Sequence, residues 1–234
     1  MNFRDITMSL DETYYLYQGK PLFDKSFINT LSFHEPGIAA VLDDSGAYHI
    51  DTNGQPIYSE RYARAFGYYD GKATVVDKDG NWFHINTQGK RLYQQSYLWC
   101  GNYQENVCAV CNHKGQYFHI DENGNSLYHD RYRYVGDFSY GIACATGEDA
   151  KLFHIMKNGQ RLYEKSFEDL GVYHKGYALA KDTIGWFHIN RAGEPIYSER
   201  YSMLEPFYNG CARARTLDGE FVIINEQGII IRTL

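Results

Sequence analysis

The sequence predicts an all-β repeat protein, with a six-bladed β-propeller as the first arrangement and a β-solenoid of stacked hairpins as the alternative. An aromatic-His-Ile tripeptide recurs at a nearly constant period, and a glycine follows each histidine after five residues. The 22 tyrosines and 13 phenylalanines favour strands, and no run keeps a helical period. The five repeat histidines are His49, His84, His119, His154 and His188.

The repeat divides the chain into a leading half unit and six full units of one domain. Residues 1–23 form the half unit, because Tyr14 to Phe23 matches only the second half of the repeat. A half unit at the start of a propeller either pairs at the seam of the ring or forms a partial seventh blade. The full units span 24–58, 59–93, 94–128, 129–163, 164–197 and 198–234, and the last of them lacks the histidine.

Each unit breaks into short β-prone runs that are separated by glycine turns. Pairs such as Asp79-Gly80 and Asn158-Gly159 favour tight hairpins. Four such runs per unit match the four antiparallel strands of a propeller blade. In the unit 129–163 the expected strands are 134–138, 142–145, 152–155 and 161–163.

Composition and charge exclude several classes of partner. The net charge of -6 and the pI near 5.8 leave no basic face for a nucleic-acid backbone. No stretch approaches the length of an apolar membrane span, and the first residues lack the charged-then-apolar run of a secretory signal. These features predict a cytoplasmic protein that binds neither nucleic acid nor membrane.

The cysteines do not form a recognisable disulfide or metal framework. Their number, five, is odd, so we expect reduced thiols. Cys108 and Cys111 have the Cys-x-x-Cys spacing, but Cys108 occupies a column where the other units place alanine. In a strand the two thiols point to opposite faces. We therefore expect a packing role for Cys108 and no metal site.

We expect the repeat histidines to have a structural role and not to bind a metal or act in catalysis. Equivalent atoms of successive units lie too far apart to share one zinc ion, whose ligands stand about 2 Å from the metal. We expect each imidazole to sit between units, bonded to a backbone carbonyl or a tyrosine hydroxyl. Histidines that are buried in the neutral form make the fold sensitive to acid.

Binding residues are sought where the units differ, because a repeated position is scaffold. One mixed column follows the Arg-Tyr or Ser-Phe pair of each unit, and its residues have the character of interface anchors. The alternative is that they are ordinary rim residues. Beginning with Asn29, the column continues through Arg64, Trp99, Tyr134, Asp169 and Met203.

The repeat resembles the bacterial WG repeat over nearly the whole chain. Gly71 to Tyr93 and Gly176 to Tyr197 carry the likeness best, in the order Gly-x-Ala, Trp-Phe-His-Ile, Gly and Tyr. Trp82-Phe83 and Trp186-Phe187 stand where that family has Trp-Gly, so the chain is a variant with Phe-His-Ile. The resemblance implies a β-repeat module of bacterial proteins and points to no single reaction.

These observations predict a non-catalytic binding or scaffold module that engages a protein partner through one face. No phosphate loop, nucleophile elbow or metal motif is present, so no catalytic residue, cofactor or metal is expected. The alternatives are a small-ligand or enzymatic site in a central cavity, and a glycan-binding repeat. Charged candidates for a central site are Asp169, Arg64, Arg213 and Arg215.

Overall fold

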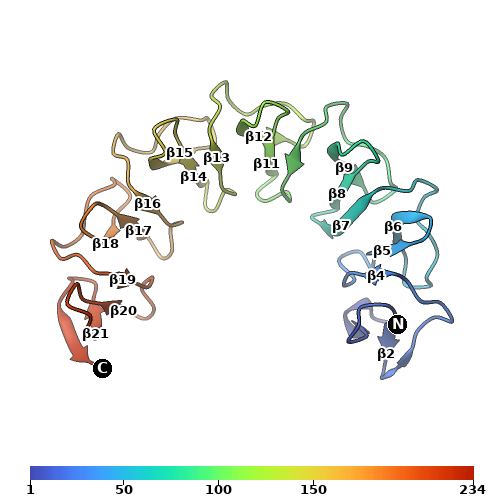
Figure 1. The fold of residues 1–234 in the computed structure, drawn as a ribbon, viewed down its shortest axis with the longest axis horizontal. Helices are drawn as coiled ribbons and strands as arrows, with labels where there is room; N and C mark the ends of the chain where they lie inside the picture. The colour runs from blue at the N-terminus through green and yellow to red at the C-terminus, as the bar shows by residue number, and fades with distance from the viewer. The chain divides into compact units, whose positions relative to one another are not determined.

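The computed structural model describes residues 1–234 and consists of small sheets joined by turns. Its 22 strands form seven sheets, and each sheet is built from strands consecutive in the chain (Figure 1). The one helix, η1 (Phe3–Asp5), is a single 3-10 turn, and no helix has the length and apolar character needed to cross a bilayer. The strands of the first four sheets are β1 (Ile6–Met8), β2 (Tyr15–Tyr17), β3 (Lys20–Pro21); β4 (Asn29–Thr30), β5 (Ala39–Asp43), β6 (Gly46–Ile50); β7 (Arg64–Tyr69), β8 (Lys72–Val76), β9 (Trp82–Asn86); and β10 (Trp99–Cys100), β11 (Val107–Cys111), β12 (Tyr117–Asp121). Those of the last three are β13 (Tyr134–Val135), β14 (Ile142–Thr146), β15 (Leu152–Met156); β16 (Asp169–Leu170), β17 (Ala178–Lys181), β18 (Trp186–Ile189); and β19 (Met203–Leu204), β20 (Cys211–Arg215), β21 (Phe221–Asn225), β22 (Ile230–Thr233).

The sheets are simpler than the four-stranded blade that the sequence predicts. Six have three strands, and only the last has four. In the unit 129–163 the expected fourth strand is wrong, because Arg161 makes only a single bridge to Ile155. The ring of Tyr163, at the end of this segment, packs against Gly193 of the next unit. The leading segment 1–23 holds a three-stranded sheet of its own, which gives seven sheets in all.

The glycine five residues after each histidine lies in a turn and also contacts an aromatic ring of the preceding unit. Gly89 has φ +76°, a conformation that residues with a Cβ rarely adopt. A Cβ there would lie 2.3 Å from the ring of Tyr58 in the preceding unit. The ring therefore packs on the bare backbone, and the same contact joins Tyr163 to Gly193 and Tyr197 to Gly228.

The repeat histidines are buried at the junctions between neighbouring sheets. His188 is typical, with Nδ1 2.6 Å from the Tyr197 hydroxyl and Nε2 3.1 Å from the Glu205 carbonyl of the next unit. Equivalent bonds run from His49 to the Phe66 carbonyl at 2.7 Å and from His154 to the Gly171 carbonyl at 3.0 Å. Each of these three imidazoles thus joins one sheet to the next. All five are at most 1% exposed, His119 included.

An arginine covers the aromatic residue that precedes each histidine, but it comes from two alternating positions. In two units the arginine lies two residues before the tyrosine of Leu-Tyr, and in three it belongs to the Arg-Tyr pair. Where one position holds arginine, the other holds serine or proline, so each ring receives one guanidinium. The pairs are Arg61 over Tyr48, Arg91 over Phe83, Arg131 over Phe118, Arg161 over Phe153 and Arg200 over Phe187, at 3.7 to 4.0 Å from the ring centroid.

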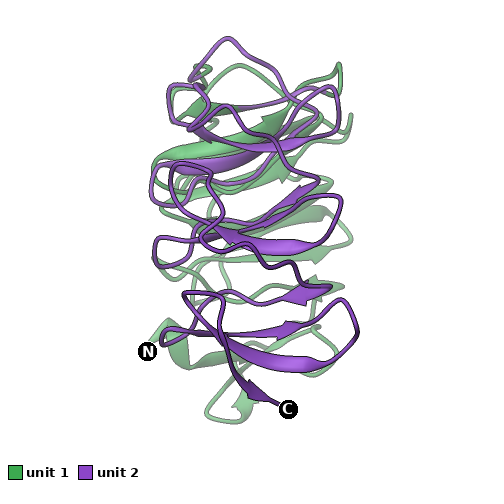
Figure 2. Cartoon of the chain, turned by 90° about the vertical axis from the view of Figure 1, so that its left-hand side faces the viewer, with its two compact units in different colours: residues 1–115, 119–126 green, residues 116–118, 127–234 purple.

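The chain forms two compact units, one of residues 1–115 with 119–126 and the other of 116–118 with 127–234 (Figure 2). Each has an apolar core between its sheets. In the first, Tyr15, Tyr48 and Ile50 are at most 1% exposed. In the second, Ile189, Ala214 and Val222 are fully buried. The aromatic column Phe33, Tyr68, Tyr103, Phe138, Tyr173 and Phe207 is buried throughout.

Candidate functional site

The variable column lies at one structural position in every full unit, the first residue of the first strand. Arg64 opens β7 and pairs with Val76, Trp99 opens β10 and pairs with Cys111, and Tyr134 opens β13. Asp169 and Met203 open β16 and β19. The column therefore lies along the edge of each sheet, at the end where the chain arrives from the preceding unit.

Two members of the column, Arg64 and Trp99, line the same cavity. The cavity has a volume of about 440 Å³ and lies between the sheet β7–β9 and the start of the next sheet. We call it the Arg64 cavity. Its walls are Arg64, Phe66, Thr74, Trp82, Trp99, Cys100, Gly101 and Asn102.

Aromatic rings form most of the wall of the Arg64 cavity. Phe66 and Trp82 stack with their centroids 5.3 Å apart and an interplanar angle of 23°. The Arg64 guanidinium lies 4.9 Å from the Phe66 centroid and 5.5 Å from that of Trp82. Opposite them, the Trp99 ring folds over Gly101, where a Cβ would come within 3.1 Å of it.

The charge of Arg64 is not neutralised within the protein. Its side chain is exposed, and no carboxylate pairs with the guanidinium. Its N–H donors remain open to a ligand while its faces rest on the rings, a geometry that suits arginine for a carboxylate. Thr74 differs, because its hydroxyl donates to the Gly101 carbonyl at 3.0 Å and holds the two sheets together.

The cavity has no group that is prepared for covalent or acid–base chemistry. Burial raises the pKa of the Cys100 thiol far above its ordinary value, so this cysteine stays protonated and unreactive. All five cysteines are free, and Cys108 bonds to the Gly101 carbonyl at 3.3 Å as a packing residue.

A smaller cleft adjoins β7 on its other side. It has a volume of about 230 Å³ and shares Arg64 and Phe66 with the Arg64 cavity. Asn29, the first member of the variable column, lines it together with Ala47. Ala47 occupies the position that Trp82 holds in the next unit, so the cleft stays open where a large ring would fill it.

The other predicted binding residues do not gather in a cavity. Tyr134 packs its ring against Tyr117 at 5.5 Å between centroids. Asp169 accepts a hydrogen bond at 2.8 Å from the adjacent amide of Leu170, and Met203 is half-buried at the start of β19. Of the charged candidates for a central site, Arg213 and Arg215 lie on β20 over the ring of Phe221, at 4.7 and 5.5 Å.

The sequence did not single out Phe66, Trp82 or Asn102 as binding residues. The signal that was available is a second variable column, two residues before each repeat histidine. It carries Ala47, Trp82, Tyr117, Leu152, Trp186 and, in the last unit, Phe221.

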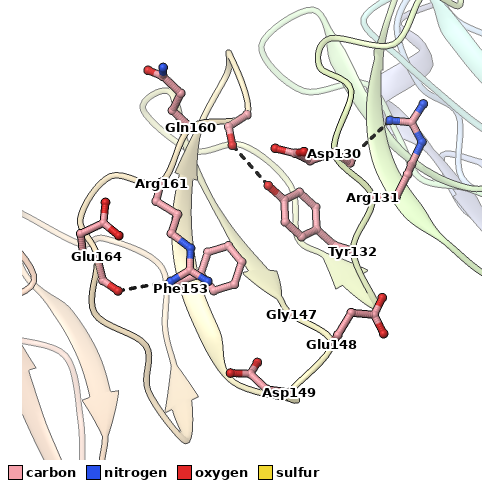
Figure 3. A pocket seen from close by; sticks show the side chains of 11 residues that line it. Asp130, Arg131, Tyr132, Gly147, Glu148, Asp149, Phe153, Gln160, Arg161 and Glu164 are labelled. Carbon is pink, nitrogen blue, oxygen red and sulfur yellow. Dashed lines mark hydrogen bonds between the residues drawn. The ribbon is translucent and has the colours of Figure 1, made fainter.

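A cavity of about 770 Å³ in the second compact unit is lined by charged side chains (Figure 3). Gly147 lines it, at a position where four of the other full units place Asp or Asn and the last places Thr216. In the next unit Asp182 takes this position and pairs with Arg200 at 2.7 Å. The Arg161 guanidinium is instead held by the Glu164 carbonyl at 3.2 Å and by the ring of Phe153. The surrounding carboxylates are Asp130, Glu148, Asp149 and Glu164.

No protein-family model and no curated protein matches this chain. Among solved structures, it is similar to BamB from Moraxella catarrhalis, a β-propeller protein, with a TM-score of 0.52 and 16% identity over 98% of this chain and 81% of that one. A eukaryotic initiation factor gives a TM-score of 0.59 with 12% identity, covering 98% and 72%. The computationally designed Ika8 protein gives 0.52 with 13% identity, covering 98% and 83%. At these identities the likeness shows the fold alone, which is that of a β-propeller.

Proposed function

We propose that this chain is a non-catalytic binding module that engages a protein partner through the Arg64 cavity. The observation that carries the proposal is the unpaired Arg64 guanidinium resting on the Phe66 and Trp82 rings. Large aromatic residues and arginine supply most of the binding energy in protein interfaces. The repeat itself, which we take to be a variant of the WG repeat, supplies the rigid support.

The chemistry of the walls defines the kind of partner. Aromatic rings on both sides of the Arg64 cavity favour an apolar or aromatic side chain, which would lie between Trp82 and Trp99. A carboxylate next to it would receive the N–H donors of Arg64. We therefore expect a peptide segment in which an acidic residue lies beside an aromatic one.

Selection from a displayed peptide library followed by calorimetric titration tests this function. We expect selected peptides to pair Asp or Glu with an aromatic residue. Arg64→Gln and Trp99→Ala should each weaken binding of such a peptide about tenfold or more, as loss of an interface anchor does. Tyr134→Ala changes the equivalent position of another unit, outside these cavities, and should leave binding unchanged.

Folding of each variant is checked by circular dichroism before titration. Peptides that bind equally well to wild type, Arg64→Gln and Trp99→Ala would exclude the Arg64 cavity as the site. A library that yields no binding peptide would count against the protein-partner function itself.

A further inference from the structure

A second cavity lies between the sheets β16–β18 and β19–β22 and differs from the Arg64 cavity in its chemistry. It has a volume of about 290 Å³, and most of its wall is apolar. Phe207 forms one side, stacked on His188 at 3.8 Å between centroids and met edge-on by Tyr177 at 5.4 Å. The lining residues are Gly171, Val172, His174, Tyr177, Leu179, His188, Pro206, Phe207 and Tyr208.

One wall of this cavity carries a buried nitrogen that has no hydrogen-bond partner. Among residues 1–234, His174 Nε2 is the only buried side-chain nitrogen or oxygen in this state. The His174 ring is fixed beside Tyr208, with centroids 5.1 Å apart. Backbone bonds between His174 and Tyr177 hold the hairpin that carries it. Buried polar groups nearly always have a partner, and a ligand in this cavity would supply one to His174 Nε2.

The equivalent histidine in the first compact unit shows that this arrangement is not a requirement of the repeat. His34 occupies the same position as His174 and faces Tyr69, the counterpart of Tyr208, at 4.7 Å. The His34 ring packs directly on Gly67, where a Cβ would come within 2.7 Å of it. Next to His174, Pro206 occupies the position that Gly67 has next to His34, and it lines the cavity.

We propose that this cavity, which we call the His174 cavity, binds a small phenol, a single aromatic ring that carries one hydroxyl. An apolar cavity of about 150 Å³ accepts benzene, so the present volume holds a substituted ring. The ring would contact Phe207, Tyr177 and Leu179, and the hydroxyl would bond to His174 Nε2. The site is independent of the protein-partner function, because it shares no residue with the Arg64 cavity.

Calorimetric titration with p-cresol and toluene, which differ by one hydroxyl, tests the assignment. We expect p-cresol to bind wild type about tenfold more tightly than toluene, the factor for one good hydrogen bond. His174→Leu should remove this difference, and His34→Leu, the matched control, should keep it. Absence of p-cresol binding, or equal binding of both compounds to wild type, would overturn the proposal.

A second variant keeps the proposal testable if His174→Leu does not fold. Val172 is 59% exposed and lines the cavity, so Val172→Trp should fold and should block p-cresol by filling the space. Unchanged affinity in Val172→Trp would place the phenol elsewhere and refute the site. N-acetyltyrosinamide distinguishes a peptide ligand, and if it binds more tightly than p-cresol the site belongs to a tyrosine side chain and the small-molecule assignment is wrong.

Discussion

The last two sheets share the order of their first three strands but present different faces. In β16–β18 the face toward the next unit carries Leu179 and His188 and is covered by β19. In β19–β22 the same positions hold Arg213, which is exposed, and Ile223, which is half-buried. Arg215, which also lies on this face, replaces Lys181 of the preceding sheet.

The difference shows what the repeat histidine does. A sheet forms without it, since Ile223 takes its place in β21 and the pairing with β20 is complete. The histidine joins a sheet to the one that follows, because its Nε2 reaches a carbonyl of that sheet. In the first sheet, which lacks the histidine, the Tyr15 hydroxyl makes the corresponding bond, to the Leu31 carbonyl at 2.7 Å. On the last sheet the exposed side chains of Arg213 and Arg215 stack on the ring of Phe221.

The largest effect on stability is expected from acid. It should weaken the sheets that carry a repeat histidine and spare the last sheet, which has none. Burial lowers the pKa of His49, His84, His154 and His188 to about 4, from 6.5 in the unfolded chain. Between these two values the unfolded chain binds more protons than the folded one, so stability falls as the pH is lowered through this window. At pH 5 the loss is roughly 2 kcal/mol per histidine, and four of them approach the whole stability of a domain.

Urea denaturation at pH 7.5 and pH 5 measures this loss. Hydrogen bonds hold the pKa of Asp77 and Asp182 below the ordinary value of an aspartate, so the titration of these carboxyl groups moves away from this pH range. Equal unfolding midpoints at the two pH values would contradict the role assigned to the histidines.

Replacing the histidine in one joint should have the next largest effect. His188→Leu keeps the volume but leaves the Glu205 carbonyl and the Tyr197 hydroxyl without their partner, which we expect to cost about 3 kcal/mol. Ile223→Leu at the equivalent position of the last sheet loses no hydrogen bond and should cost less than about 1.5 kcal/mol. Equilibrium urea unfolding compares the two, and similar losses would mean that the histidine only fills space.

Two glycines of the last unit allow the stability cost of a ring contact to be measured separately from the cost of backbone strain. Gly228 and Gly210 have φ of +73° and +77°, but only Gly228 lies under a ring, that of Tyr197. Gly210→Ala should cost about 1 kcal/mol from the conformation alone. Gly228→Ala adds a Cβ at 2.6 Å from the ring and should cost about 1–2 kcal/mol more. Thermal unfolding measures both losses. Equal losses would mean that the contact with the Tyr197 ring adds nothing to the cost of the substitution.

The smallest effect is expected from moving an arginine between its two positions. Arg161→Ser uncovers Phe153 and should cost about 1 kcal/mol. Adding Ser166→Arg to this variant places an arginine where Arg200 stands in the next unit, so most of the loss should be recovered. Chemical denaturation of the single and double variants decides this, and a double variant no more stable than Arg161→Ser would show that the positions are not equivalent.

The sequence determined the repeat, the strand class and the burial of its constant positions. The period places each histidine and its tyrosine nine residues apart, and the tight glycine turn brings them together. Local chemistry is sufficient for such features, because a turn and a two-residue side-chain alternation act within one unit. The variable column was also visible, since Arg64 and Trp99 break a repeat that is otherwise regular.

Only the tertiary structure decided which variable residues form a site. Trp82 belongs to a different strand from Arg64, and Trp99 belongs to the next sheet, so their meeting depends on the width of the cleft between sheets. The same holds for His174, whose Nε2 has no hydrogen-bond partner. In the first compact unit the ring of the equivalent His34 packs on Gly67, whereas Pro206 stands at that position beside His174. A cavity is the space that side chains of neighbouring sheets leave unfilled, and that depends on packing between residues distant in the chain.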